Sequence, residues 1–119
     1  MQPYILILED DPILGKVALE AAKHVGLQAQ LDNNGDKYRK LIDDHGVPQA
    51  ILLDLHLPFA SGSELLKEFR SDSRMKNVLI LVMTADILRA RSLQEQGERV
   101  LLKPVSITRL QEILSQLQG

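Results

Sequence analysis

The most constraining feature of this sequence is a short apolar run that ends in a single carboxylate. Residues 50–54 read Ala-Ile-Leu-Leu-Asp, and Pro58 and Gly62 then break the chain. A continuous apolar run bounded by breakers is typical of a strand buried on both faces of a parallel sheet. Asp54 then stands at the carboxyl end of a central strand, where open α/β sheets bind their ligands. Taken alone, an Asp at this place is equally well explained by a local turn hydrogen bond.

Four further segments have the composition of strands, and helical patterns separate them. The expected strands are 4–8, 27–31, 51–54, 78–83 and 99–102. The expected helices are 12–25, 38–45, 63–70, 86–96 and a last one from Ser106 onward. Strands that alternate with helices through right-handed crossovers predict a single α/β domain over residues 1–119, a three-layer sandwich around a five-stranded parallel sheet with five helices.

The composition excludes several classes of protein. The chain has 14 basic and 16 acidic residues without a long run of one sign, which argues against nucleic acid as a direct partner. It has no cysteine, so disulfides and thiolate metal sites are excluded. No apolar run approaches the length of a membrane span, and we expect a cytoplasmic protein without a membrane partner. Acids follow the first strand in place of Gly-x-Gly-x-x-Gly, which argues against dinucleotide binding.

Polar side chains follow four of the five expected strands. They are Glu9, Asp10, Asp54, Thr84 and Lys103. In a doubly wound sheet these strand ends lie along one edge, so the side chains are expected to converge on one pocket. Clustered carboxylates need a cation, and ligands that are all oxygen select a hard ion such as Mg²⁺. A carboxylate beside Mg²⁺, with an ammonium and a hydroxyl opposite, has the parts for phosphoryl transfer to Asp54.

Each of these residues also has a simpler interpretation. The acids at 9–11 could form only an acidic helix start, which is worth about 0.3–1 kcal/mol against the helix dipole. Thr84 could be a core hydroxyl, and Lys103 could be an ordinary surface lysine. These interpretations do not explain why every polar strand end falls on the same edge of the sheet.

Four motifs give the chain a resemblance to the receiver domain of two-component response regulators, over essentially all 119 residues. They read ILILEDDP at 5–12, LLDLHLP at 52–58 with Gly62, VMTA at 82–85, and LKP at 102–104. The resemblance implies a flavodoxin-like fold with strand order 2-1-3-4-5. It also implies a phosphoacceptor that catalyses only its own phosphorylation and dephosphorylation. Its partners would be a sensor histidine kinase or histidine phosphotransfer protein and an unknown effector domain or output protein.

The resemblance implies a role for each residue of the set. Asp54 matches the residue that accepts the phosphoryl group from a phosphohistidine. Asp10 matches a direct Mg²⁺ ligand, and Glu9 matches a neighbour that acts through a bound water. His56 matches the residue that supplies a backbone carbonyl to the metal, while its imidazole is expected to face solvent. Thr84 and Lys103 match the groups that bind the phosphoryl oxygens, and the Lys103-Pro104 peptide is often cis in the family.

Three departures from the family pattern concern the output of the domain. Val100 replaces the usual aromatic residue, the stretch 84–103 is shorter by about one helical turn, and Arg109-Leu110 replaces Glu-Leu in the last helix. We therefore expect a normal acceptor site that is read out differently, without dimerisation through the last two helices.

Two alternatives remain open at this stage. A degenerate receiver could serve as a phosphorylation-independent binding module, although the complete acceptor set argues against it. An aspartyl phosphatase would need a second acid where His56 stands. The sequence also leaves open the cognate kinase, the lifetime of the aspartyl phosphate, and whether the receiver is free-standing or belongs to a longer protein.

Overall fold

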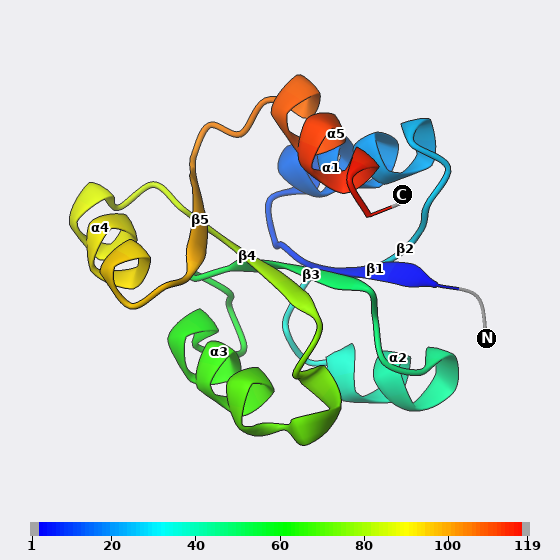
Figure 1. Cartoon of the computed structure of the whole chain (residues 1–119), viewed down its shortest axis with the longest axis horizontal. Coiled ribbons are helices and arrows are strands. Elements are labelled where there is room, and N and C mark those ends of the chain that lie inside the picture. Colours follow the sequence, from blue (N-terminus) through cyan, green and yellow to red (C-terminus); the bar gives the residue numbers. More distant parts are fainter. Residues whose placement is uncertain (1–2, 118–119) are drawn as a thin grey trace.

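The structure is a computed structural model that describes residues 3–117, and it has five strands in one sheet between two layers of helices (Figure 1). The strands are β1 (Tyr4–Leu8), β2 (Gln28–Asp32), β3 (Ala50–Asp54), β4 (Leu79–Thr84) and β5 (Arg99–Leu102). The helices are α1 (Pro12–His24), α2 (Tyr38–His45), α3 (Gly62–Ser71), the 3₁₀ helix η1 (Ser73–Met75), α4 (Ile87–Glu95) and α5 (Ile107–Ser115). Residues 1–2 and 118–119 of the predicted domain lie outside the described part of the chain.

The sheet confirms the predicted fold class. All pairs of neighbouring strands are parallel, and their order is β2-β1-β3-β4-β5. This places β3, with Asp54 at its carboxyl end, in the centre of the sheet, and β2 at one edge as predicted. Within residues 3–117, none of the helices has the length and apolar character that crossing a bilayer requires.

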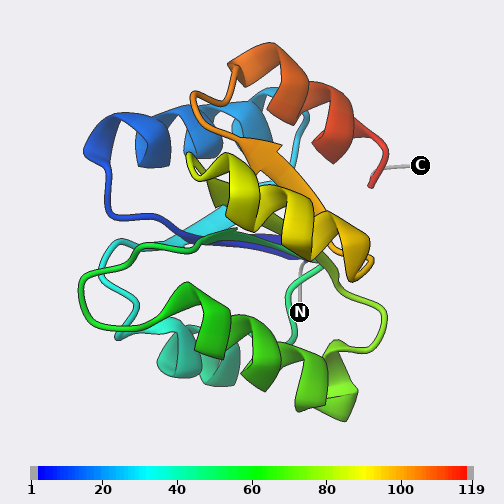
Figure 2. The same ribbon diagram turned by 90° about the vertical axis from the view of Figure 1, so that its left-hand side faces the viewer.

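Two apolar cores lie on opposite faces of the sheet. Helices α1 and α5 cover one face, α2 and α3 cover the other, and α4 lies alongside β5 (Figure 2). Every residue of β1 and of β3 is buried, because successive side chains point to opposite faces and both faces are covered. Leu53 thus packs in the core on the α2 and α3 side, and Leu52 packs in the core on the α1 and α5 side.

Side-chain caps set the starts of four of the α-helices. The N-cap residues are Asp11, Ser61, Asp86 and Ser106, and each accepts a hydrogen bond from a backbone N–H in the first turn. Pro12 follows the first cap, at the helix position that favours proline. Caps of this kind are worth about 1 kcal/mol each. Asp11, Asp86 and Ser106 lie within four residues of the ends of β1, β4 and β5, the strand ends that carry predicted site residues.

Each predicted bound of a strand or helix agrees with the observed one to within one residue, and two differences have an identifiable physical cause. Strand β2 spans 28–32, one residue later than expected, because the buried Asp32 carboxylate accepts backbone N–H groups of Asn34, Gly35 and Lys37 at 2.8–3.1 Å and ends the strand there. The connection between α3 and β4, for which no helix was predicted, contains η1, which buries Met75. Both differences depend on contacts that hydrophobic periodicity does not report.

The connection from β4 to α4 consists of only Ala85 and Asp86. Helix α4 itself has nine residues. This short connection places the first turn of α4 next to the end of β4, whereas the shortening of the stretch 84–103 relative to the family stays a prediction.

Candidate functional site

Three carboxylates meet where β1 and β3 end. Leu8 of β1 is in register with Leu53 of β3, so Glu9, the next residue in its chain, lies beside Asp54. Oxygen atoms of Glu9, Asp10 and Asp54 all lie within 4.8 Å of one another. Glu9 and Asp54 are each 1% exposed, whereas Asp10 is open to solvent. The predicted convergence of these acids is present, and their oxygens could hold a metal ion.

Lys103 contacts two of these acids. Its ammonium nitrogen lies 3.0 Å from Glu9 Oε1 and 3.3 Å from Asp54 Oδ2. The Lys103 backbone N–H donates to the Thr84 carbonyl at 2.9 Å, and the Lys103-Pro104 peptide is cis, as predicted. Although the ammonium is close, Glu9 Oε1 is buried and accepts no well-directed hydrogen bond within residues 3–117. The contact is therefore an ion pair that leaves this oxygen with capacity for a further ligand.

Thr84 and His56 flank the acids. Thr84 is fully buried at the end of β4, one residue after Met83, which is in register with Asp54. Its Oγ1 accepts the N–H of Asp86 at 3.1 Å, so the hydroxyl proton is available to a ligand. The His56 N–H donates to Asp54 Oδ1 at 3.0 Å, and the His56 side chain is exposed, as expected.

The charges of the site depend on one another. Burial, followed by a hydrogen bond with Asp54, raises the pKa of Glu9 to about 7. Burial alone would raise the pKa of Asp54 as well, but hydrogen bonds with Glu9 and the His56 N–H and the charge of Lys103 hold that pKa below its usual value. Burial lowers the pKa of Lys103, but the hydrogen bonds and negative charges of Glu9 and Asp54 together outweigh this effect, so the pKa is raised above its usual value. At neutral pH, Asp54 is therefore ionised, whereas Glu9 is partly protonated.

The raised pKa of Glu9 predicts a pH-dependent stability for the metal-free protein. Glu9 binds its proton more tightly in the folded state, because its pKa is about 7 there against an ordinary 4.5. Its favourable contribution to the free energy of unfolding is therefore complete below pH 4.5 and is lost as the pH rises through 7. Asp54, with a lowered pKa, and Lys103, with a raised one, stay charged throughout this window.

Urea unfolding without Mg²⁺ from pH 4.5 to 8 tests this prediction. The free energy of unfolding of the wild type, relative to Glu9→Gln, should fall by roughly 3 kcal/mol across the window. A difference that stays constant with pH would show that Glu9 does not titrate there.

Gly62 has a structural role that the sequence did not reveal, because it enters there only as a chain breaker and as part of a family motif. A Cβ atom at Gly62 would lie 2.4 Å from Leu55 Cα and 2.6 Å from the Asp54 carbonyl oxygen. The Gly62 N–H donates to the Leu55 carbonyl at 3.2 Å. The start of α3 thus packs directly on the backbone that carries Asp54, and only glycine fits there.

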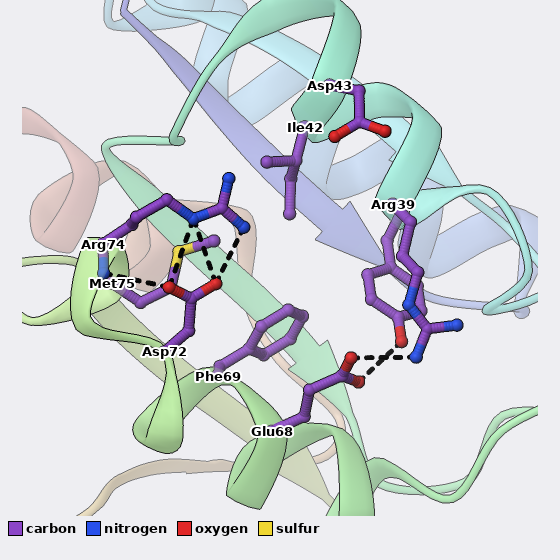
Figure 3. A pocket seen from close by; sticks show the side chains of 9 residues that line it. Arg39, Ile42, Asp43, Glu68, Phe69, Asp72, Arg74 and Met75 are labelled. Carbon is purple, nitrogen blue, oxygen red and sulfur yellow. Dashed lines mark hydrogen bonds and ion pairs between the residues drawn. The ribbon is translucent and has the colours of Figure 1, made fainter.

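A separate cleft of about 180 Å³ lies between α2 and α3 (Figure 3). Its floor is apolar, with Phe69 among its buried residues. Two arginines line it, and both are paired, Arg39 with Glu68 and Arg74 with Asp72, each at 2.8 Å. None of the predicted site residues lines this cleft. Because both arginines are paired with acids, the cleft has no unpaired arginine for an anionic ligand. The acidic edge of the sheet therefore remains the candidate site.

Comparison with known proteins agrees with this arrangement. The family model of the response regulator receiver domain matches residues 5–115. The polar-differentiation response regulator DivK of Brucella anthropi is 26% identical over 122 residues, which cover 100% of this chain and 98% of that protein. The transcriptional regulatory protein BaeR of Escherichia coli is 31% identical over 104 residues, which cover 87% of this chain and 43% of that longer protein.

Solved structures give the same result. The receiver domain of a sensor histidine kinase from Pseudomonas aeruginosa has a TM-score of 0.80 and 26% identity, with 100% of both chains covered, and it holds a magnesium ion in its active site cleft. The receiver domain of a DNA-binding response regulator from Colwellia psychrerythraea has a TM-score of 0.84 at 20% identity. Sequence motifs, strand order and the acidic edge therefore lead to one conclusion: this chain belongs to the response regulator receiver domain family of two-component signal transduction.

Proposed function

We propose that Asp54 accepts a phosphoryl group from a phosphohistidine. Receiver domains interact with histidine kinases and effector domains, and we assign the donor here to a sensor histidine kinase or a histidine phosphotransfer protein. The observation that carries the proposal is the buried Asp54 carboxylate at the end of β3, which belongs to the acidic cluster and lies 3.3 Å from the Lys103 ammonium. The single domain 1–119 then acts as a cytoplasmic phosphoacceptor that catalyses only its own phosphorylation and dephosphorylation.

The transfer needs a nucleophile and groups that stabilise the moving charge. The lowered pKa keeps Asp54 ionised, so one carboxylate oxygen can form a bond to phosphorus as the phosphorus–nitrogen bond breaks and its electron pair stays on the imidazole. Lys103, already beside Asp54, is placed to pair with the phosphoryl oxygens. The Thr84 hydroxyl, whose proton is uncommitted, is the further donor that we assign to a phosphoryl oxygen.

The acidic cluster fits a magnesium ion. Its ligand atoms are all carboxylate oxygens, and Glu9 Oε1 is buried without a hydrogen-bond partner in the described chain, which suits a site that receives a hard cation. We assign direct binding to Asp10, Asp54 and the His56 backbone carbonyl, with Glu9 acting through a water. When bound, the ion neutralises charge that builds up on the phosphoryl oxygens.

Intact mass after incubation with acetyl phosphate tests the proposal. We expect the gain of one phosphoryl group with Mg²⁺ present and no gain when the metal is chelated. Because a small donor can fail where a kinase succeeds, a phosphorylated histidine kinase serves as a second donor. Failure with both donors would contradict the proposal and leave the phosphorylation-independent binding module as the function.

An apolar surface beside the acidic edge suits the docking of a phosphohistidine protein. Ile13, Leu14, Pro104 and Val105 line a cleft of about 440 Å³ that also includes Lys103. Ile13 is 76% exposed at the start of α1, so a protein that brings a phosphohistidine to Asp54 would cover it.

We therefore expect Ile13→Glu to slow transfer from a histidine kinase by about tenfold, the effect of losing a well-buried apolar contact, while transfer from acetyl phosphate stays unchanged. Rates with the two donors, followed by radiolabel, check this. Val47→Glu is the matched control. Val47 is an exposed apolar residue that precedes β3, so it lies near the amino-terminal end of the strand whose carboxyl end carries Asp54. Equal loss with both donors would place Ile13 in the chemistry or the folding instead of in docking.

A further inference from the structure

The short connection after β4 joins the acceptor site to α4 through one residue. The Asp86 N–H donates to Thr84 Oγ1 at 3.1 Å. The Asp86 carboxylate caps α4, because its Oδ1 accepts the N–H of Arg89 at 3.0 Å. Asp86 thus contacts the buried hydroxyl through its backbone and the first turn of the helix through its side chain.

Helix α4 is also held from outside. The Arg89 side chain donates to the Ser63 hydroxyl in the first turn of α3. In the same turn, Gly62 packs on the backbone of Asp54 and Leu55. Hydrogen bonds therefore connect Thr84 through Asp86 and Arg89 to the first turn of α3. That turn packs through Gly62 on the backbone beside Asp54.

The hydrogen bond at Thr84 has a definite orientation. The oxygen of a hydroxyl accepts while its single proton donates, so the Asp86 N–H occupies a lone pair and leaves the proton free. Threonine is stiff at χ1, and hydrogen bonds in series strengthen one another in a buried site.

Val100, which stands where the family usually has an aromatic ring, is half-buried against the core and has no ring to move.

We propose that Asp86 is a positioning residue for the Thr84 hydroxyl and that it makes the capping of α4 and phosphorylation of Asp54 depend on each other. This inference rests on the proposed function of Asp54. The Asp86 carboxylate caps α4, and the contact between Arg89 and Ser63 supports that cap. The cap fixes the Asp86 backbone N–H, which orients the Thr84 hydroxyl toward a phosphoryl oxygen. Since coupling between two sites is reciprocal, a phosphoryl group that engages the hydroxyl also stabilises the first turn of α4.

Beryllofluoride, which occupies an aspartate as a phosphoryl mimic, tests the first half of the coupling. We expect Asp86→Ala to weaken beryllofluoride binding in the presence of Mg²⁺ by about fivefold, the equivalent of one lost cap. Asp86→Asn, which can still cap, should bind like the wild type. Asp72→Ala is the matched control, because it removes a cap from η1, which contacts none of the site residues. Equal binding by Asp86→Ala and the wild type would overturn the proposal.

Amide hydrogen exchange in the first turn of α4 tests the other half. Beryllofluoride should slow the exchange of the Arg89 and Ala90 amides by about the same fivefold factor in the wild type and in Asp86→Asn. In Asp86→Ala the slowing should be absent. Exchange in the wild type that does not respond to bound beryllofluoride would overturn the coupling alone. A wild type that does not bind beryllofluoride would overturn the proposed role of Asp54, and this inference with it.

Discussion

Replacement of Asp54 by Asn is expected to abolish phosphorylation by acetyl phosphate and by a histidine kinase. The amide has nearly the same shape and can still accept the His56 N–H, now 3.0 Å from Asp54 Oδ1, but it lacks the anionic oxygen that attacks phosphorus. Intact mass should show the gain of one phosphoryl group in the wild type and none in Asp54→Asn under the same conditions.

Asp32→Asn is the matched control for this experiment. Asp32 is also a buried carboxylate at the carboxyl end of a strand, but its oxygens accept backbone N–H groups in the loop after β2. We expect this variant to lose stability and to keep its phosphorylation. A phosphoryl group retained by Asp54→Asn would place the acceptor elsewhere, with Asp10, the exposed acid of the cluster, as the first residue to test.

Replacement of Gly62 by Ala is expected to lower the free energy of unfolding by about 3 kcal/mol or more, at the upper end of the cost of overpacking. The added methyl group would meet backbone atoms at 2.4–2.9 Å, and these cannot move away as the end of a flexible side chain can. Relief requires α3 to shift from the strand end, so phosphorylation of Asp54 should slow as well. Urea unfolding and the rate of phosphorylation measure the two effects.

Gly15→Ala supplies the control, because the same substitution is made inside a helix with room for the methyl group. The nearest atom to a Cβ at Gly15 is Leu31 Cδ2 at 3.5 Å, an ordinary contact. This variant should be more stable than the wild type by about 0.5–1 kcal/mol, since alanine is the better helix former. A Gly62→Ala protein as stable as the wild type would show that the start of α3 can yield.

Much of the fold could be predicted because burial dominates it. The apolar runs of β1 and β3 have no plausible place except between two helical layers, and the confirmed sheet follows from them. Caps such as Asp11 before Pro12 are local chemistry, so the sequence reports them. The predicted end of β2 was wrong by one residue, because the hydrogen bonds that Asp32 accepts outweigh the apolar pattern there.

The site was predicted only as a set of residue types at one edge. Their convergence follows from the topology, but the distances from Lys103 to the two acids depend on how β5 packs on β4, which no motif contains. The close approach at Gly62 and the hydrogen bond from Asp86 to Thr84 involve backbone atoms, whose contacts leave little signature in side-chain patterns.

The raised pKa of Glu9 has a consequence for the heat of metal binding. With that pKa at about 7, Glu9 carries on average about half a proton at pH 7 in the metal-free protein. A magnesium ion that takes the site displaces this proton into solution, where the buffer absorbs it. The calorimetric enthalpy of Mg²⁺ binding should therefore vary with the ionisation enthalpy of the buffer at pH 7 and become independent of it near pH 9. Metal binding at neutral pH should therefore release about half a proton from each domain.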